Sequence, residues 1–141
     1  MHKSIIISSI VLLLLVSCNL DQVTSRYESF EEAKSKGLFD KGWIPEKILF
    51  ESMSDIFLQT NLDRNTCIFS FKLNSEDYFS LKETLGLVIY REDLAKLGVD
   101  LPNWWLENTS LIEDIYTVPP NDLVFLKVDD NNYNVYGWFL D

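Results

Sequence analysis

The sequence predicts an α+β fold in which a small, mostly antiparallel sheet packs against two or three short helices. Two stretches alternate apolar and polar residues on either side of a polar turn, which is typical of β-hairpins. Two other stretches combine helix caps with helical spacing of apolar residues. The chain has 141 residues, of which 47% are hydrophobic, so it can build one packed domain. We therefore expect two hairpins, about four strands in all, in a single domain over residues 27–141.

A short helix is predicted over residues 29–36. Ser29 and Glu32 have the spacing of a capping box, and Gly37 can adopt the left-handed conformation that ends many helices. In the loop that follows, Trp43 lies between a glycine and a proline that turn the chain, so we expect its indole in the core.

The first predicted hairpin joins residues 55–60 to residues 67–73. Both segments alternate apolar and polar side chains, and the residues between them are rich in asparagine and aspartate, which favour turns. Cys67 lies on the apolar side of the second strand, so it is expected to be a small buried side chain.

A second helix is predicted to begin after Asn74. This residue is a favourable N-cap, and Gly86 can end the helix. Between them, apolar residues recur at helical spacing, which indicates one buried helix face. These residues are Tyr78, Leu81 and Leu85.

The C-terminal part of the chain predicts a second hairpin between residues 123–128 and 133–140. Before it, residues 87–90 form a short apolar run of ambiguous type, residues 92–97 favour another helical turn or two, and residues 111–118 favour an extended segment. The turn of the hairpin superficially resembles a calcium-binding loop. However, valine stands where such a loop needs glycine, so we expect no metal site there.

The N-terminal segment resembles the signal peptide of bacterial lipoproteins. A positive start precedes an apolar run over residues 5–16, which is shorter than the roughly 20 residues that span a membrane. Leu15-Val16-Ser17-Cys18 is similar to the lipobox, in which a small residue precedes a lipidated cysteine. This resemblance implies cleavage between Ser17 and Cys18 and attachment of acyl chains, such as palmitate, to Cys18. Residues 18–26 would then tether the domain to the lipid.

Lipidation would place the protein in the bacterial cell envelope, anchored to a membrane. Asn19 follows the cysteine where an aspartate would favour the inner membrane in enteric bacteria. In a host with two membranes, this slightly favours the outer membrane, with the domain facing the periplasm. Cys67 would then have no partner for an internal disulfide, because Cys18 is the only other cysteine.

Charge and composition exclude several classes of function. Acidic residues outnumber basic ones by 22 to 12, giving a formal charge of −10, which disfavours nucleic acid as a partner. The only histidine, His2, lies in the signal segment, so the mature domain has no imidazole for a Ser-His-Asp or Cys-His site or for a histidine-containing zinc site. Phosphate-binding glycine motifs are also missing from the sequence. We therefore assign no cofactor, no metal and no catalytic residue.

A series of short motifs resembles an uncharacterised family of small bacterial proteins, many of which are lipoproteins. The resemblance covers residues 27–73 and implies a shared small fold and export, with no activity. The chain departs from the family pattern at Leu49 or Phe50, where a second proline is usual, and at Cys67 or Ile68, where tryptophan is frequent. The matching residues are Tyr27, Ala33, Gly37, Gly42-Trp43-Ile44-Pro45, Asp55-Ile56, Leu62-Asp63-Arg64-Asn65 and Phe71.

Trp104 and Trp105 are the residues that most suggest an interaction site. Adjacent side chains rarely face the same core, so one reading is that an indole is partly exposed and stacks on a sugar or anchors a protein. The favoured interpretation is that both indoles are buried, one of them with its N–H hydrogen-bonded to the backbone.

Two classes of function remain open. The preferred one is a membrane-anchored, non-catalytic binding or interaction module whose partner is a basic protein, as for an immunity-type lipoprotein that neutralises an exported toxin. The alternative is a hydrolase of envelope glycans that uses paired carboxylates, with Trp104 or Trp105 as a sugar platform.

Overall fold

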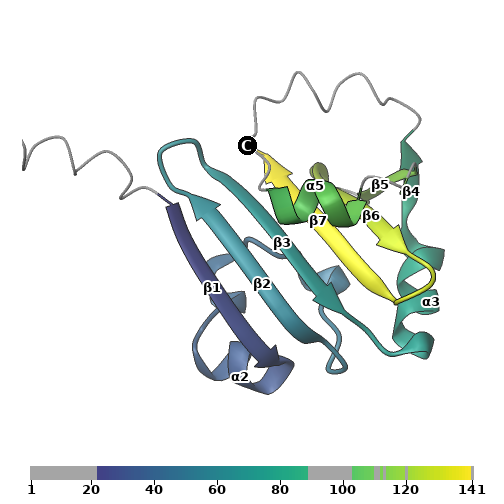
Figure 1. Ribbon diagram of the computed structural model, residues 1–141, viewed down its shortest axis with the longest axis horizontal. Coiled ribbons are helices and arrows are strands. Elements are labelled where there is room, and N and C mark those ends of the chain that lie inside the picture. The colour runs from purple at the N-terminus through teal and green to yellow at the C-terminus, as the bar shows by residue number, and fades with distance from the viewer. Residues whose placement is uncertain (1–21, 89–102, 110–111, 113, 120, 141) are drawn as a thin grey trace, which may run out of the picture.

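The computed structural model describes residues 22–88, 103–109, 112, 114–119 and 121–140, in which helices cover both faces of an antiparallel sheet (Figure 1). Within these residues the sheet has seven strands in the order β1-β2-β3-β7-β6-β5-β4, and every neighbouring pair of strands is antiparallel. The α+β class is therefore confirmed, whereas the expected number of about four strands is too low. The elements are β1 (Gln22–Ser29), α2 (Phe30–Ser35), η2 (Phe39–Lys41), η3 (Glu46–Ile48), β2 (Ser54–Asn61), β3 (Thr66–Lys72), α3 (Ser75–Thr84), β4 (Gly86–Val88), α5 (Asn103–Thr109), β5 (Ile115–Val118), β6 (Asn121–Asp129) and β7 (Asn134–Leu140).

Both predicted hairpins are confirmed. The first joins β2 to β3 and the second joins β6 to β7. Asn65 in the first turn and Tyr133 in the second have φ angles of 48° and 57°, so each turn includes one residue in the left-handed region. The segment that superficially resembles a calcium-binding loop is therefore the turn of the second hairpin.

The two capped helices also begin where the sequence predicted. The Ser29 hydroxyl accepts a hydrogen bond from the Glu32 N–H of α2 at 3.3 Å. The Asn74 side chain accepts one from the Asp77 N–H of α3 at 2.8 Å. Each cap satisfies a backbone donor that the helix itself leaves free.

The sheet separates two apolar clusters because successive strand side chains point to opposite faces. The larger cluster lies on the face covered by α2, η3 and α3, and it includes Cys67 and Phe69. Cys67 is buried, as the sequence predicted. Gly137 of β7 leaves room for the Phe69 ring of β3, because a Cβ atom at residue 137 would overlap that ring. Trp43 is half-buried and packs against this cluster.

The second cluster lies on the opposite face, under α5. Its members come from β3, β5, β7 and α5 itself, so apolar packing on these strands holds the helix. These residues are Ile68, Trp105, Ile115, Tyr136 and Trp138.

Strand β1 was not predicted from the sequence. Residues 22–26, which were expected to belong to a polar tether, pair with β2 as part of an edge strand. Ser17, Cys18 and the helical segment predicted at 92–97 lie outside the described residues. Within the part of the chain that is described, no helix is both long enough and apolar enough to cross a bilayer.

Candidate functional site

The two tryptophans singled out from the sequence lie on α5 and differ in exposure. Trp105 is only 2% exposed and packs edge-on against Trp138, with ring centroids 5.3 Å apart. Its indole N–H has no hydrogen-bond partner among the described residues. Trp104 is half-buried and packs edge-on against Phe57 of β2, with ring centroids 4.4 Å apart. Of the pair, only Trp104 retains surface that a partner could contact.

A more extensive candidate surface is the edge of the sheet at β1, whose outer side pairs with no strand among the described residues (Figure 1). Two hydrogen bonds show which way its peptide groups point. The Val23 carbonyl accepts from the Thr60 hydroxyl on β2, at 3.4 Å, whereas the Glu28 N–H donates to Glu32 of α2, at 2.8 Å. Since peptide groups of alternate strand residues point to opposite sides, the even-numbered residues of β1 direct their N–H and C=O groups away from β2. Apart from Glu28, these residues are Gln22, Thr24 and Arg26.

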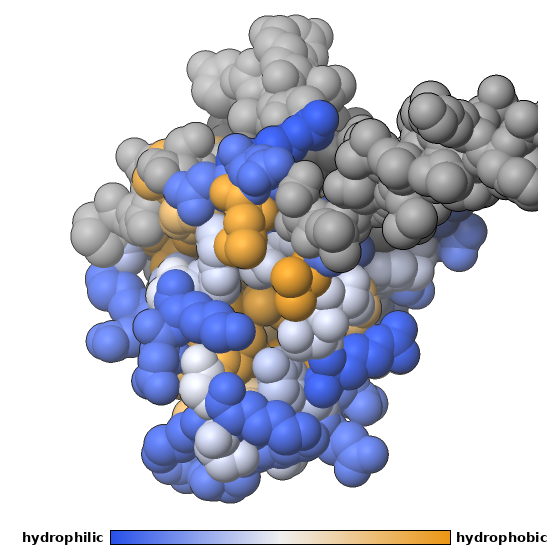
Figure 2. All heavy atoms as spheres, turned by 90° about the vertical axis from the view of Figure 1, so that its left-hand side faces the viewer, coloured by the Kyte–Doolittle hydropathy of each residue, from blue (hydrophilic) through white to orange (hydrophobic). Residues whose placement is uncertain are grey.

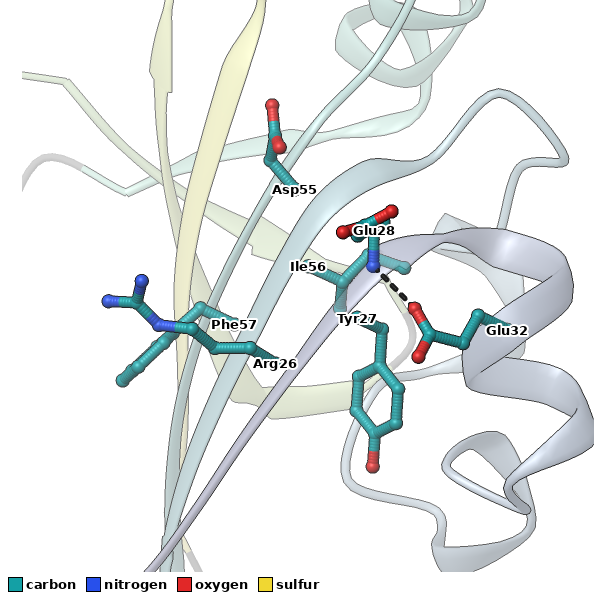
Figure 3. A pocket seen from close by; sticks show the side chains of 7 residues that line it. All are labelled: Arg26, Tyr27, Glu28, Glu32, Asp55, Ile56 and Phe57. Carbon is teal, nitrogen blue, oxygen red and sulfur yellow. Dashed lines mark hydrogen bonds between the residues drawn. The ribbon is translucent and has the colours of Figure 1, made fainter.

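A groove of about 390 Å³ lies at the end of this edge (Figure 3). It forms where β2 carries one extra residue relative to β3, between Ser54 and Phe57. Asp55 in this β-bulge has a φ angle of 49°, a conformation that aspartate tolerates better than most residues. The bulge opens the end of the strand pair. The lining residues are Arg26, Tyr27, Glu28, Glu32, Asp55, Ile56 and Phe57.

The charged side chains of the groove fall into two groups. Glu32 is already occupied, because one of its oxygens contacts Lys36 at 2.6 Å and the other accepts the Glu28 N–H. The hydrogen bond from Lys36 is the main cause that lowers the pKa of Glu32. By contrast, the Glu28 and Asp55 carboxylates form no ion pair or hydrogen bond with any side chain that the structure describes.

Arg26 is the one cation that lines the groove. Its guanidinium lies over the Phe57 ring, 5.2 Å from the centroid, and so it is held by a cation–π contact. Figure 3 shows the Arg26 and Asp55 side chains pointing away from each other. The groove therefore carries a positive group on one side and two unpaired carboxylates on the other.

A second hollow, of about 240 Å³, lies between α3 and the turn of the β6–β7 hairpin. Lys82 and the Tyr78 hydroxyl both donate to the same oxygen of Asp130, each at 2.6 Å. The hydrogen bond from Lys82, and to a smaller extent that from Tyr78, lowers the pKa of Asp130. The pKa of Tyr78 is raised, mainly by burial and next by its hydrogen bond to Asp130. The cluster ties α3 to the hairpin. In the described part of the chain, no three acidic or sulfur ligands are grouped to hold a metal ion.

Strand β1 and the residues that line the groove lie in a part of the chain that is similar to a known protein family. Residues 21–72 match the family model of the YbbD head domain. The N-terminal part of this chain is similar to that domain. The match runs from β1 through β3, covers less than half of the chain, and supports the uncharacterised-family resemblance expected for residues 27–73. No curated protein and no solved structure matches the chain.

The groove was not predicted from the sequence. Its chemistry depends on Arg26, which was assigned to the tether, on Glu28, to which no role was assigned, and on Asp55, which was predicted only as the start of a strand and as part of the motif series. A weak signal was present, since Val23 and Tyr27 alternate with polar residues as in a strand with one solvated face.

Proposed function

We propose that this protein is a bacterial lipoprotein, held on a membrane by acyl chains on Cys18, whose domain binds a basic protein. The observation that carries this proposal is the open edge of β1 beside two carboxylates that have no cationic partner in the described part of the chain. Backbone donors and acceptors along an open strand suit a polypeptide ligand better than a small apolar one. The carboxylates of Glu28 and Asp55 favour a partner of opposite charge.

The charge of the whole chain supports the same class of partner. A formal charge of −10 attracts basic proteins at long range and raises the rate of productive encounter. Inhibition of a basic exported toxin by an immunity-type lipoprotein would be one role of this kind. A membrane anchor would keep such a module in the envelope, facing the periplasm from the outer membrane where the host has one.

A glycan hydrolase is the alternative, and the groove supports it less well. Such an enzyme needs one carboxyl group whose pKa is raised so that it can donate a proton. The Glu32 carboxyl has its pKa lowered instead. Neither Trp104 nor Trp105 lines the groove, so the expected sugar platform is not beside its carboxylates.

The lipid anchor is tested by Cys18→Ser, with Cys67→Ala as the matched cysteine control. We expect Cys18→Ser either to leave the precursor unprocessed or to release the domain from membranes, because no thiol remains for acylation. Cell fractionation and intact mass measurement check both outcomes. Membrane-bound, processed Cys18→Ser protein without its signal would contradict the anchor.

The binding function is tested by capture from detergent-solubilised membranes of the native cells, using the lipidated full chain. We expect one basic protein in stoichiometric amount, which should rebind the purified lipoprotein directly. Recovery of peptidoglycan fragments alone, with soluble sugars released on incubation, would favour the hydrolase.

A further inference from the structure

We propose that β1 accepts an extended segment of the basic partner as an additional strand, and that a Lys or Arg of this segment reaches Glu28 and Asp55. This inference rests on the proposed function and names its contact surface. Strand addition supplies backbone hydrogen bonds for affinity, while alternate side chains supply specificity.

The open edge has a defined length. Gln22, Thr24 and Arg26 each present an N–H and a C=O to an incoming strand, as the two bonds of Val23 and Glu28 indicate. Glu32 occupies the N–H of Glu28, so added pairing should stop there. The side of the molecule that carries β1 is largely hydrophilic around a small apolar area, which suits a segment of mixed polarity (Figure 2).

Charge sets the position of the basic side chain in the added strand. Arg26 and Glu28 are two residues apart on β1, so they lie on the same face of the sheet, and Asp55 lies on the neighbouring strand. A cation of the added strand directly opposite Arg26 would be repelled. A cation two residues further along, opposite Glu28, would instead face the carboxylates of Glu28 and Asp55. The occupant should therefore carry its Lys or Arg near the end that pairs by Glu28.

A second copy of this chain fits the edge less well. Two copies would bring together acidic domains of the same charge. A symmetric antiparallel register that sets Arg26 opposite Glu28 of the other copy would also pair Thr24 with Phe30 and Gln22 with Glu32. Phe30 and Glu32 belong to α2, so they have no strand edge to offer.

The test uses the lipidated full chain in detergent and synthetic peptides of about nine residues with blocked ends. The peptides alternate Thr and Val and carry one Lys at each position in turn; control peptides replace Lys by Glu or N-methylate alternate amides. Fluorescence anisotropy gives the dissociation constant, and hydrogen exchange locates the site. We expect at least one Lys peptide to bind and to protect residues 22–28, while the Glu and N-methylated versions bind at least tenfold more weakly.

Charge variants test the groove. Glu28→Gln and Asp55→Asn should each weaken the best Lys peptide about fivefold, the size expected for one exposed ion pair. Asparagine tolerates the left-handed conformation of residue 55, so the second change removes charge without straining the backbone. The matched control is Asp63→Asn, an exposed carboxylate in the turn at the other end of β2, which should leave binding unchanged.

Several outcomes would overturn the inference. They are equal binding of the N-methylated peptide, protection only outside residues 22–28, equal loss of affinity in Asp63→Asn, failure of every Lys peptide, and self-association of the chain through β1. If a native basic partner binds while residues 22–28 stay unprotected, this inference fails and the proposed function stands. If no basic partner is captured, the proposed function fails as well.

Discussion

Asp130 links two elements that are far apart in the sequence through a single oxygen atom. Lys82 and Tyr78 of α3 both donate to it, and each bond favours the ionised carboxylate, so the pKa of Asp130 is lowered from its ordinary value of 3.8. Because this pKa is lower in the folded chain than in the unfolded one, the ionised group stabilises the fold above the ordinary value. That contribution is lost as the pH falls through the folded pKa.

Tyr78→Phe should raise the pKa of Asp130 towards its ordinary value, because one donor to the carboxylate is removed while Lys82 remains. NMR titration of the side-chain carboxyl carbon measures the shift. In the matched variant Asp130→Asn, the acid-induced loss of stability should become shallower. An Asp130 pKa that is the same with and without the Tyr78 hydroxyl would show that Lys82 alone sets it.

At the level of elements, α3 depends on its N-cap. The Asn74 side chain satisfies the Asp77 N–H, and Tyr78 and Leu81 anchor the same helix in the larger apolar cluster. Asn74→Ala should therefore lower the free energy of unfolding by about 1 kcal/mol. Asn74→Asp should retain most of the stability, since aspartate caps equally well. Urea unfolding followed by circular dichroism measures both, and equal losses would contradict a capping role.

Elements with local signals were predictable, and those that depend on distant partners were not. The caps of α2 and α3 and the two hairpins each carry their signal within a few residues. Strand β1 has only Val23 and Tyr27 as large apolar residues, because much of it faces solvent at the edge. Its strand conformation is fixed by pairing with β2, about thirty residues further on. The expected number of about four strands was too low because it left out β1 and also β4 and β5, whose residues were predicted as an ambiguous apolar run and an extended segment.

The groove could not be predicted from the sequence for the same physical reason. It requires the pairing of β1 with β2 together with a bulge at Asp55, and neither can be read from the spacing of residues along one strand. Trp104 and Trp105 attracted attention because adjacent aromatic residues are conspicuous in a sequence. In the fold, Trp105 packs into the second cluster and Trp104 covers Phe57.

At the scale of the whole molecule, the sheet joins two parts of the chain that meet between β3 and β7. Seven residue pairs, from Thr66 with Leu140 to Lys72 with Asn134, cross this junction. The larger apolar cluster also crosses it, since Val124, Leu126 and Val135 pack with residues that precede Lys72. The region similar to the YbbD head domain ends at residue 72, at this junction.

A chain truncated after Lys72 should therefore fail to fold cooperatively. The truncation would leave β3 as a second open edge and remove Val124, Leu126 and Val135 from the apolar cluster, so both backbone pairing and burial would be lost. Urea unfolding should show no sharp transition, and the NMR amide signals should be poorly dispersed. Co-expression of residues 73–141 should restore both properties by supplying β7 and its neighbours. A sharp transition of the truncated chain alone would instead show that β1, β2 and β3 form an independent domain, to which the C-terminal strands are an addition.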